Sequence, residues 1–371
     1  MSIGQRLKYA RERAALTGTQ VHERTGIGES SLSEFENGKR EPSLGQLRLL
    51  AQAYKRSVPF FLSEGAIPSE VVFWRKRPQP GAEEIEVEFL QLCENYHNLE
   101  VWTGEKPLVR LPQAEGNSEG FGYPQAEELA KTFRRELQLG DHPTHALLKV
   151  LEEVCAVKVF HLTFEPSGTA ASTFSDTFGP AILMNSANCR WRRNHDLAHE
   201  LFHLLTWKLF RDTTQPTQAA EATEREESLA TCFARHLLMP TEPLRTAINS
   251  RQKNGKIRFE DLHDVAREFD VSVESLLWHM HLVYGHSSSE SEKTRQAIER
   301  AKALAPALED RSEASPPRWP ARYEALAVKA LRRGEISIGR FADYLGISRQ
   351  QAMKYIEQEA TGNEEIQVAP A

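Results

Sequence analysis

The run His199-Glu200-Leu201-Phe202-His203 constrains this chain more than any other feature of its sequence. Residues four positions apart share one face of an α-helix, so the two imidazoles can converge on a single metal ion. The carboxylate of Glu200 lies beside them, where it can accept a proton from water at the metal. We therefore predict a buried helix from about 190 to 205 that carries a hydrolytic metal site. Its apolar flanks would hold the ligands still: Leu197, Ala198, Leu201, Leu204 and Leu205.

A catalytic zinc site needs a third protein ligand and one open position. Glu224, Glu226 and Glu227 stand at the start of a second predicted helix, which runs from about 221 to 238. Glu227 fits the apolar register of that helix best, and Glu226 is the next choice. The alternative is a solvated helix N-terminus, where acidic side chains are favoured without any metal. Two imidazoles and a carboxylate suit zinc, and manganese is also compatible.

His195 lies one helical turn before His199, and we expect it to be packed or hydrogen-bonded rather than to be a fourth ligand. Two apolar runs, 157–160 and 181–184, predict strands, whereas 165–179 is a stretch rich in Gly, Ser and Thr. We expect the strand at 181–185 to hold a peptide substrate by backbone pairing, as an exposed sheet edge can.

The bulk composition is that of a globular protein whose 371 residues suggest two or three domains. The net charge of −6 excludes a protein that coats nucleic acid non-specifically, so any DNA binding must be local. The four cysteines form no Cys-x-x-Cys pair, which argues against a disulfide framework and a thiolate zinc site. The N-terminus lacks a signal-peptide pattern, and no apolar run is long enough for a membrane span. We expect a cytoplasmic protein without membrane contact.

The fold class that these patterns predict is multidomain and mainly α-helical, with a small sheet. Short helices joined by tight turns fill 1–64, and a less regular connecting segment follows. The central domain combines helices with the small sheet, and a linker rich in Ser, Glu, Ala and Pro separates it from a last helical unit. The predicted ranges are 1–64 for the N-terminal domain, 65–120 for the connecting segment, 121–285 for the central domain, 286–319 for the linker, 320–358 for the C-terminal helix-turn-helix-like unit and 359–371 for a disordered tail.

Residues 193–205, which read RNHDLAHELFHLL, resemble the active-site helix of the ImmA/IrrE family of metallopeptidases. The residues from Glu227 to Pro240 and the strand at 179–185 are similar to two further signatures of that family. The resemblance covers roughly 121–285 and implies a gluzincin-like α+β domain. It implies His199, His203 and Glu227 as metal ligands and Glu200 as the catalytic base. In that family the substrates are typically helix-turn-helix repressors. Thr231 departs from the usual pattern, which has Asn at this position.

Residues 5–63 resemble the XRE, lambda-repressor-like helix-turn-helix domain. The match rests on Gly26-Ile27-Gly28, Ser31-Leu32-Ser33, the run from Glu36 to Arg40, and Pro42-Ser43. It implies that 29–37 is the recognition helix. The residues then expected at DNA are Ser30, Ser31 and Ser33, with Lys39 and Arg40 on phosphates.

The net charge of this N-terminal segment favours DNA binding only mildly. Its 64 residues hold 10 Lys and Arg against 7 Asp and Glu. Glu29 and Glu34 place acid on the helix that would enter the major groove. The alternative for this segment is a helical protein-interaction module. A homodimer is plausible for an operator-binding protein of this type.

The function that these features favour is a zinc-dependent endopeptidase fused to a DNA-binding domain. It would cleave a regulatory, repressor-type protein and so control transcription in a stress or mobile-element response. One alternative is a non-enzymatic transcriptional regulator whose peptidase-like domain senses a metal or ligand. Another is a component of a toxin–antitoxin or phage-defence system.

Overall fold

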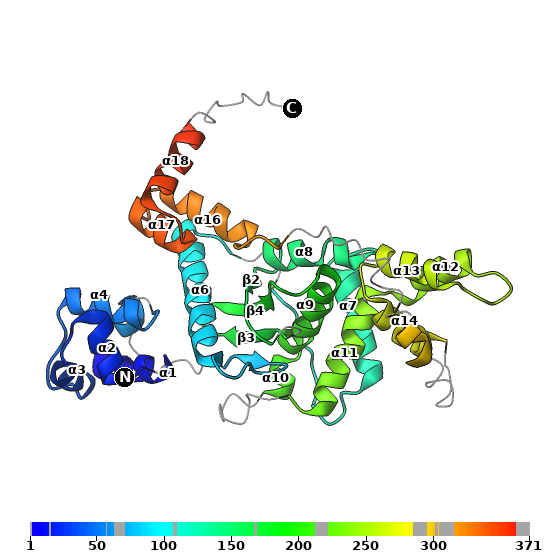
Figure 1. Ribbon diagram of the computed structural model, residues 1–371, viewed down its shortest axis with the longest axis horizontal. Coiled ribbons are helices and arrows are strands. Elements are labelled where there is room, and N and C mark those ends of the chain that lie inside the picture. Colours follow the sequence, from blue (N-terminus) through cyan, green and yellow to red (C-terminus); the bar gives the residue numbers. More distant parts are fainter. Residues whose placement is uncertain are drawn as a thin grey trace.

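The computed structural model describes residues 2–14, 16–56, 58–62, 71–106, 110–166, 169–211, 222–284, 295–300, 303 and 315–360. Figure 1 shows a group of N-terminal helices, a central sheet with helices on both faces, and a C-terminal group of helices beside α6. This arrangement confirms the predicted fold class, which is mainly helical with a small sheet. No helix within the described ranges is both long and apolar enough to cross a membrane. The four cysteines are free thiols.

The N-terminal domain has its own apolar core and contains five short helices. They are α1 (Ile3–Arg13), α2 (Gly18–Thr25), α3 (Glu29–Glu36), α4 (Leu44–Ala53) and α5 (Val58–Leu62). Helix α2 begins at the predicted cap Thr17, whose side chain accepts from the backbone N–H of Gln20. It ends at Gly26, which adopts the left-handed conformation with φ 72°. These caps fix the α2–turn–α3 unit that the sequence predicts.

The central sheet has four strands in the order β1-β3-β4-β2. The strands are β1 (Phe73–Trp74), β2 (Lys158–Leu162), β3 (Ala171–Ser175) and β4 (Gly179–Asn185). Strands β3 and β4 form an antiparallel hairpin, and β2 runs parallel to β4. Strand β1 pairs antiparallel with the outer edge of β3, with Phe73 opposite Ser172 and Trp74 opposite Ala171.

The prediction that the strand at 181–185 is an exposed peptide-binding edge is wrong. Strand β4 has β3 on one side and β2 on the other, so its backbone groups are engaged in the sheet. Strand β3 lies in the Gly-, Ser- and Thr-rich stretch where no strand was expected. Its edge that faces away from β4 is paired with β1.

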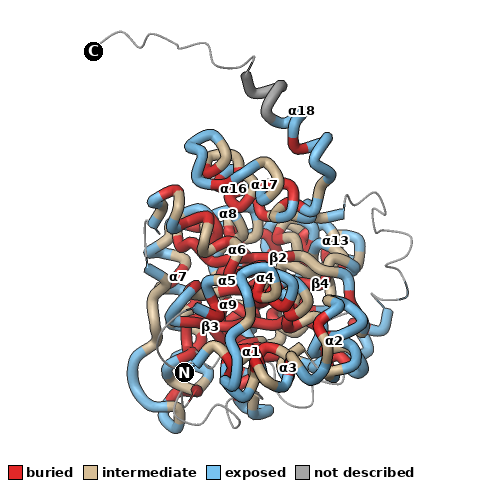
Figure 2. Tube along the Cα trace, turned by 90° about the vertical axis from the view of Figure 1, so that its left-hand side faces the viewer, coloured by how far each residue is buried: buried red, intermediate tan, exposed pale blue. Residues whose placement is uncertain are grey.

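Helices cover both faces of this sheet and create two apolar cores. On one face lie α7 (Tyr123–Glu136), α9 (Arg190–Leu205) and α11 (Glu224–Leu238). On the other lie α6 (Ala82–Thr103) and α16 (Ala321–Arg332). Figure 2 shows the buried part of the chain concentrated around the strands and α9. The segment at 73–103, which the sequence placed in a connector, thus contributes a strand and a long helix to the central fold.

The remaining elements surround this framework. They are the 3-10 turn η1 (Pro143–His145), α8 (Leu147–Glu153), α10 (Trp207–Phe210), α12 (Thr241–Arg251), α13 (Phe259–Glu268), α14 (Val273–Val283), α17 (Ile338–Leu345) and α18 (Arg349–Ala360). Gly346, in the left-handed region with φ 58°, makes the turn between α17 and α18. The predicted linker at 286–319 and tail at 359–371 lie largely outside the described residues.

Candidate metal centre

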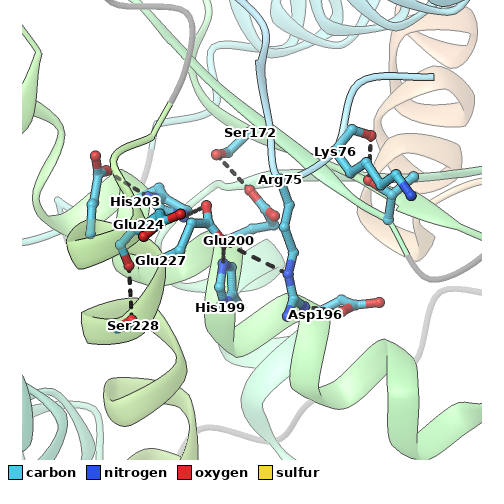
Figure 3. Close-up of polar contacts among 12 residues, drawn as sticks. Arg75, Lys76, Ser172, Asp196, His199, Glu200, His203, Glu224, Glu227 and Ser228 are labelled. Carbon is cyan, nitrogen blue, oxygen red and sulfur yellow. Dashed lines mark hydrogen bonds and ion pairs between the residues drawn. The ribbon is translucent and has the colours of Figure 1, made fainter. Parts of the chain in front are cut away.

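Helix α9 brings the three residues of the central motif to one buried place. His199 and Glu200 are fully buried, and His203 has 1% of its surface exposed. The helix spans the predicted range, because its apolar face packs into the core between the sheet and α11. Successive turns therefore present both imidazoles toward the start of α11 (Figure 3).

Helix α11 supplies Glu227 as the third group. Its Oε2 atom lies 3.1 Å from Nε2 of His199, and its Oε1 atom lies 3.5 Å from Nε2 of His203. One ligand atom from each of the three residues falls within 4.8 Å of the others, and this is the one such group that could hold a metal ion among the described residues. The geometry agrees with the ligand set expected from the sequence.

The donor atoms at this place fit a zinc ion. Nε2 of His203 and Oε1 of Glu227 are buried and have no hydrogen-bond partner among the described residues. Buried polar atoms without a partner are unfavourable in a folded protein unless an ion or water satisfies them. Two imidazole nitrogens and a carboxylate match the three-ligand pattern of catalytic zinc.

Glu226, the second choice for a ligand from the sequence, supports His203 instead. Nδ1 of His203 donates to Oε1 of Glu226 at 2.9 Å, which leaves Nε2 turned toward Glu227. Arg211 is also buried and donates to both carboxylate oxygens of Glu226, at 2.9 and 2.5 Å. Such outer partners fix the tautomer and orientation of a metal-ligating histidine. No sequence signal pointed to Arg211, because it meets Glu226 only in the folded chain.

Glu200 is held by strand β3. Ser172 donates its hydroxyl to Oε2 of Glu200 at 2.8 Å, and Oε1 of Glu200 has no partner among the described residues. Burial raises the pKa of Glu200 to about 7, although the nearby His203 and the Ser172 hydrogen bond oppose this shift. A carboxylate with a pKa near neutrality and one free oxygen is suited to take up and release a proton.

Burial and neighbouring polar groups set the pKa values of the other titratable residues of the centre. Burial lowers the pKa of His199 to about 3, so this imidazole is neutral and able to bind a metal. Burial also opposes the charge on His203, but the hydrogen bond to Glu226 and the nearby carboxylate of Glu227 outweigh it and raise the pKa of His203 to about 9. Burial likewise opposes the charge on Glu227, yet the hydrogen bond from His199 and the nearby imidazole of His203 hold its pKa well below the ordinary value.

His195 does not join the metal-binding group. Its ring lies 6.1 Å from that of His199, and burial lowers its pKa. Its neighbour Asp196 is almost fully buried and accepts hydrogen bonds from Asn188 and Arg192. His195 is thus packed beside a polar network, as the sequence suggested.

One cation reaches this centre from outside the motif helices. Arg75 follows β1, and its Nε atom lies 3.7 Å from Oε2 of Glu227 while Nη1 lies 3.4 Å from Oδ1 of Asp196 (Figure 3). The adjacent Phe73 packs its ring 4.6 Å from that of His203. Neither residue was a candidate from the sequence, because β1 is short and distant from the motif along the chain.

The residues expected at DNA lie on and just after α3. Ser30 and Ser33 are exposed and Ser31 is partly exposed. The side-chain amide of Asn37 donates to Oγ of Ser33 at 3.3 Å. Lys39 and Arg40 are exposed in the following turn, where Arg40 also pairs with Glu34 at 3.5 Å. These residues are thus accessible to different degrees along α3 and in the turn that follows it, and their contact with DNA stays a prediction.

Fold and site together define a protein in which a helix-turn-helix domain is joined to a domain whose buried central helix carries His199, Glu200 and His203. Comparison with protein families identifies both parts. Residues 2–59 match the family described as "Helix-turn-helix domain", and residues 152–280 match the "IrrE N-terminal-like domain". The chain therefore combines an XRE-like helix-turn-helix domain with an ImmA/IrrE-like domain, as the sequence motifs indicated.

Among curated proteins, the HTH-type transcriptional regulator ImmR of Bacillus subtilis (strain 168) is 34% identical over 67 residues. The match covers 18% of this chain and 53% of the relative, so this chain spans about half the length of that relative. Solved structures of PlcR from Bacillus thuringiensis, bound to the peptide PapR7 and DNA, and of ComR from Streptococcus suis also match. Their identities are 12% and 13%, with 97% and 98% of this chain and 97% of each of theirs covered. The TM-scores are 0.17 and 0.16.

Proposed function

We propose that this protein is a zinc-dependent endopeptidase, joined to a DNA-binding domain, that cleaves a regulatory protein of the repressor type. The observation that carries the proposal is the convergence of His199, His203 and Glu227 on one buried point. Glu200 lies on the same helix with one carboxylate oxygen free. A sensor of metal alone would have no need for such a proton acceptor.

The mechanism follows from the positions of these side chains. Zinc held by the three ligands would supply a Lewis acid for water and for the peptide carbonyl. Glu200 takes a proton from the attacking water, and Ser172 keeps its carboxylate oriented during the transfer. As the C–O bond forms and the C–N bond breaks, Glu200 returns the proton to the leaving nitrogen. The products are one carboxylate and one amine, and Glu200 is regenerated.

The substrate class is supported by the domain combination rather than by a pocket. The ImmA/IrrE-like domain and the helix-turn-helix domain lie in one chain, and the matched regulator ImmR is described as a transcriptional regulator. A protease that binds near an operator would meet repressors at high local concentration. We therefore propose a helix-turn-helix repressor as the substrate and DNA as a partner, with Ser30, Ser31, Ser33, Lys39 and Arg40 at the interface.

The test combines metal analysis with cleavage of candidate repressors, using wild type beside Glu200→Gln. We expect both proteins to bind about one zinc ion per chain, because Glu200 is not a ligand. Cleavage should fall by at least about a thousandfold in the variant, since proton transfer and the developing charge both depend on this carboxylate. Equal cleavage by the two proteins would refute the role of Glu200, and zinc-free wild type would refute the metal centre.

A further inference from the structure

The outer edge of β3 is the place where an extended peptide would meet the metal centre. Strand β3 carries Ser172, which bonds Glu200, and its other edge is already paired with β4. A peptide that adds to a sheet edge does so through its backbone and presents alternate side chains to one face. A peptide bound at this edge would therefore present some of its side chains toward Glu200 and His203.

The chain's own segment at 72–76 already lies on that edge. Phe73 pairs with Ser172, Trp74 with Ala171, and the backbone N–H of Arg75 donates to the carbonyl of Ala170 at 3.4 Å. The pairing continues one step further, where the hydroxyl of Thr169 donates to the carbonyl of Lys76 at 2.8 Å. The segment therefore follows the antiparallel course that an added strand would take.

The side chains of this segment also enter the centre. The ring of Phe73 is fully buried between His203, at 4.6 Å, and the guanidinium of Arg211, which lies 3.9 Å from the ring centroid. Arg75 reaches Glu227 and Asp196 from the same side. A guanidinium beside Glu227 competes with a metal ion for the carboxylate, because both are cations.

We propose that residues 72–76 are an inhibitory internal strand, which occupies the peptide-binding edge of the metal centre and must leave β3 before a protein substrate can be cut. This inference rests on the proposed peptidase function. The position of the strand in the chain suits a regulatory role, since it follows the helix-turn-helix domain and precedes α6. The regular ladder of the strand contains two residues and the side chain of Arg75 is a quarter exposed, whereas the buried side chains of Phe73 and Trp74 must leave their cores when the strand detaches.

A covalent lock tests the inference in the full chain. Lys76→Cys combined with Thr169→Cys places two thiols at facing positions of adjacent strands, a separation that a disulfide can bridge. Phe73, Trp74 and Arg75 remain intact in this variant. With zinc bound and fluorophore-labelled casein as the probe, the oxidised protein should cut no faster than Glu200→Gln. Reduction with a phosphine should restore the wild-type rate.

A release variant tests the opposite direction. Arg75→Gln removes the ion pairs with Glu227 and Asp196 and should increase the detached fraction about fivefold, the size expected for a partly exposed pair. Cleavage of casein should rise by a similar factor, and hydrogen exchange at the amides of 72–76 should accelerate. The matched control is Arg77→Gln, directly after the segment, whose side chain pairs with Glu83 and Glu86 on α6 instead. Both readouts should stay at wild-type levels in that control.

The outcomes distinguish a failure of the inhibitory strand from a failure of the proposed peptidase function. If the zinc-loaded wild type and Arg75→Gln proteins cut neither casein nor the candidate repressors, the proposed function fails and the inference falls with it. If they cut but the oxidised lock cuts equally fast, the function stands and the inhibitory strand is overturned. A Glu200-dependent cut within residues 71–77 would also overturn it, because the segment would then be a substrate.

Discussion

At the residue scale, two adjacent glutamates of α11 make different contacts in the candidate metal centre. Glu227 faces both Nε2 atoms, whereas Glu226 accepts from Nδ1 of His203 and from Arg211. The first is therefore placed to bind the ion and the second to orient a ligand. The division depends on one position of the helix, since consecutive residues point about 100° apart.

This division predicts different effects for matched substitutions. Glu226→Gln should weaken zinc binding by about 10- to 100-fold, because the amide is a poorer acceptor for His203 and leaves Arg211 buried without its carboxylate. Glu227→Gln should weaken it further, since a ligand is lost. The control is Glu224→Gln, an exposed residue one turn earlier. Competition with a zinc-binding dye measures all three, and equal affinities for Glu226→Gln and Glu224→Gln would contradict the assignment.

The buried carboxylate of Glu152 on α8 predicts a pH dependence of the free energy of unfolding. Burial raises its pKa from 4.5 to about 8. In the unfolded chain this group ionises near pH 4.5, but in the folded chain it ionises only near pH 8. The protonated group therefore imposes no penalty below pH 4.5, and stability is lost progressively as the pH rises through this window.

The neutral variant Glu152→Gln removes that loss. We expect its free energy of unfolding to equal the wild-type value near pH 4 and to exceed it by about 2–4 kcal/mol above pH 8. Urea unfolding at several pH values measures the difference. A constant difference across the range would show that the carboxyl does not titrate in the fold as described.

The sequence predicted the residues of the centre that carry their own local pattern. His199, Glu200 and His203 are recognisable because helical periodicity alone places them together. Glu227 follows from the register of its helix. Ser172 and Arg75 meet the centre only through strand pairing between distant segments. Nothing in the local sequence of either residue specifies that pairing.

At the scale of elements, the sheet shows why strand β3 escaped prediction. Strand β4 is a continuous apolar run and was expected, whereas β3 reads Ala-Ser-Thr-Phe-Ser. The buried hydroxyl of Ser172 donates to Glu200, whereas that of Thr173 has no hydrogen-bond partner among the described residues. Strand β1 has two residues in its ladder, and its pairing with β3 joins segments that are distant in the chain. The hydrophobic pattern therefore identified the interior strand but misjudged it as an edge.

The start of α11 is the element on which the ligand geometry depends. The side chain of Thr223 accepts from the backbone N–H of Glu226 at 3.2 Å and so caps the turn that carries both glutamates. Thr223→Ala should lower the free energy of unfolding by about 1 kcal/mol. It should also weaken zinc binding, because the first turn frays.

Thr223→Ser retains the capping oxygen and provides the control. Thermal unfolding and zinc affinity should both return to near wild-type values in this variant. If the alanine and serine variants behave alike, the cap does not support the ligand helix.

At the scale of the whole molecule, buried ion pairs join parts that are distant in the chain. Glu100 on α6 binds Nζ of Lys158 on β2 at 2.8 Å and Nη1 of Arg322 on α16 at 2.5 Å. All three residues are less than 10% exposed. The C-terminal unit is thus tied through α6 to the sheet that carries the metal centre.

This network predicts a large effect from one substitution. Glu100→Ala leaves two buried cations without their partner and should lower the free energy of unfolding by about 3–5 kcal/mol. Glu105→Ala breaks a pair between the residue just after the end of α6 and Lys329 on α16, but both side chains are 38% exposed. That control should change stability by less than about 1 kcal/mol. Chemical unfolding measures both, and similar losses would mean that the buried network does not hold the unit.

Phe73 and Trp74 are neighbours in the sequence, yet the first packs into the core around the metal helix and the second into the core beneath α6. Every strand sorts its residues in this way, so each side chain belongs to one core only. A lineage can therefore accept changes beneath α6, where the C-terminal unit attaches, without altering the neighbours of the metal ligands. The sheet separates the core around the metal ligands from the core to which the C-terminal unit attaches. Residues of the second core can therefore be substituted during evolution while the metal site keeps its surroundings.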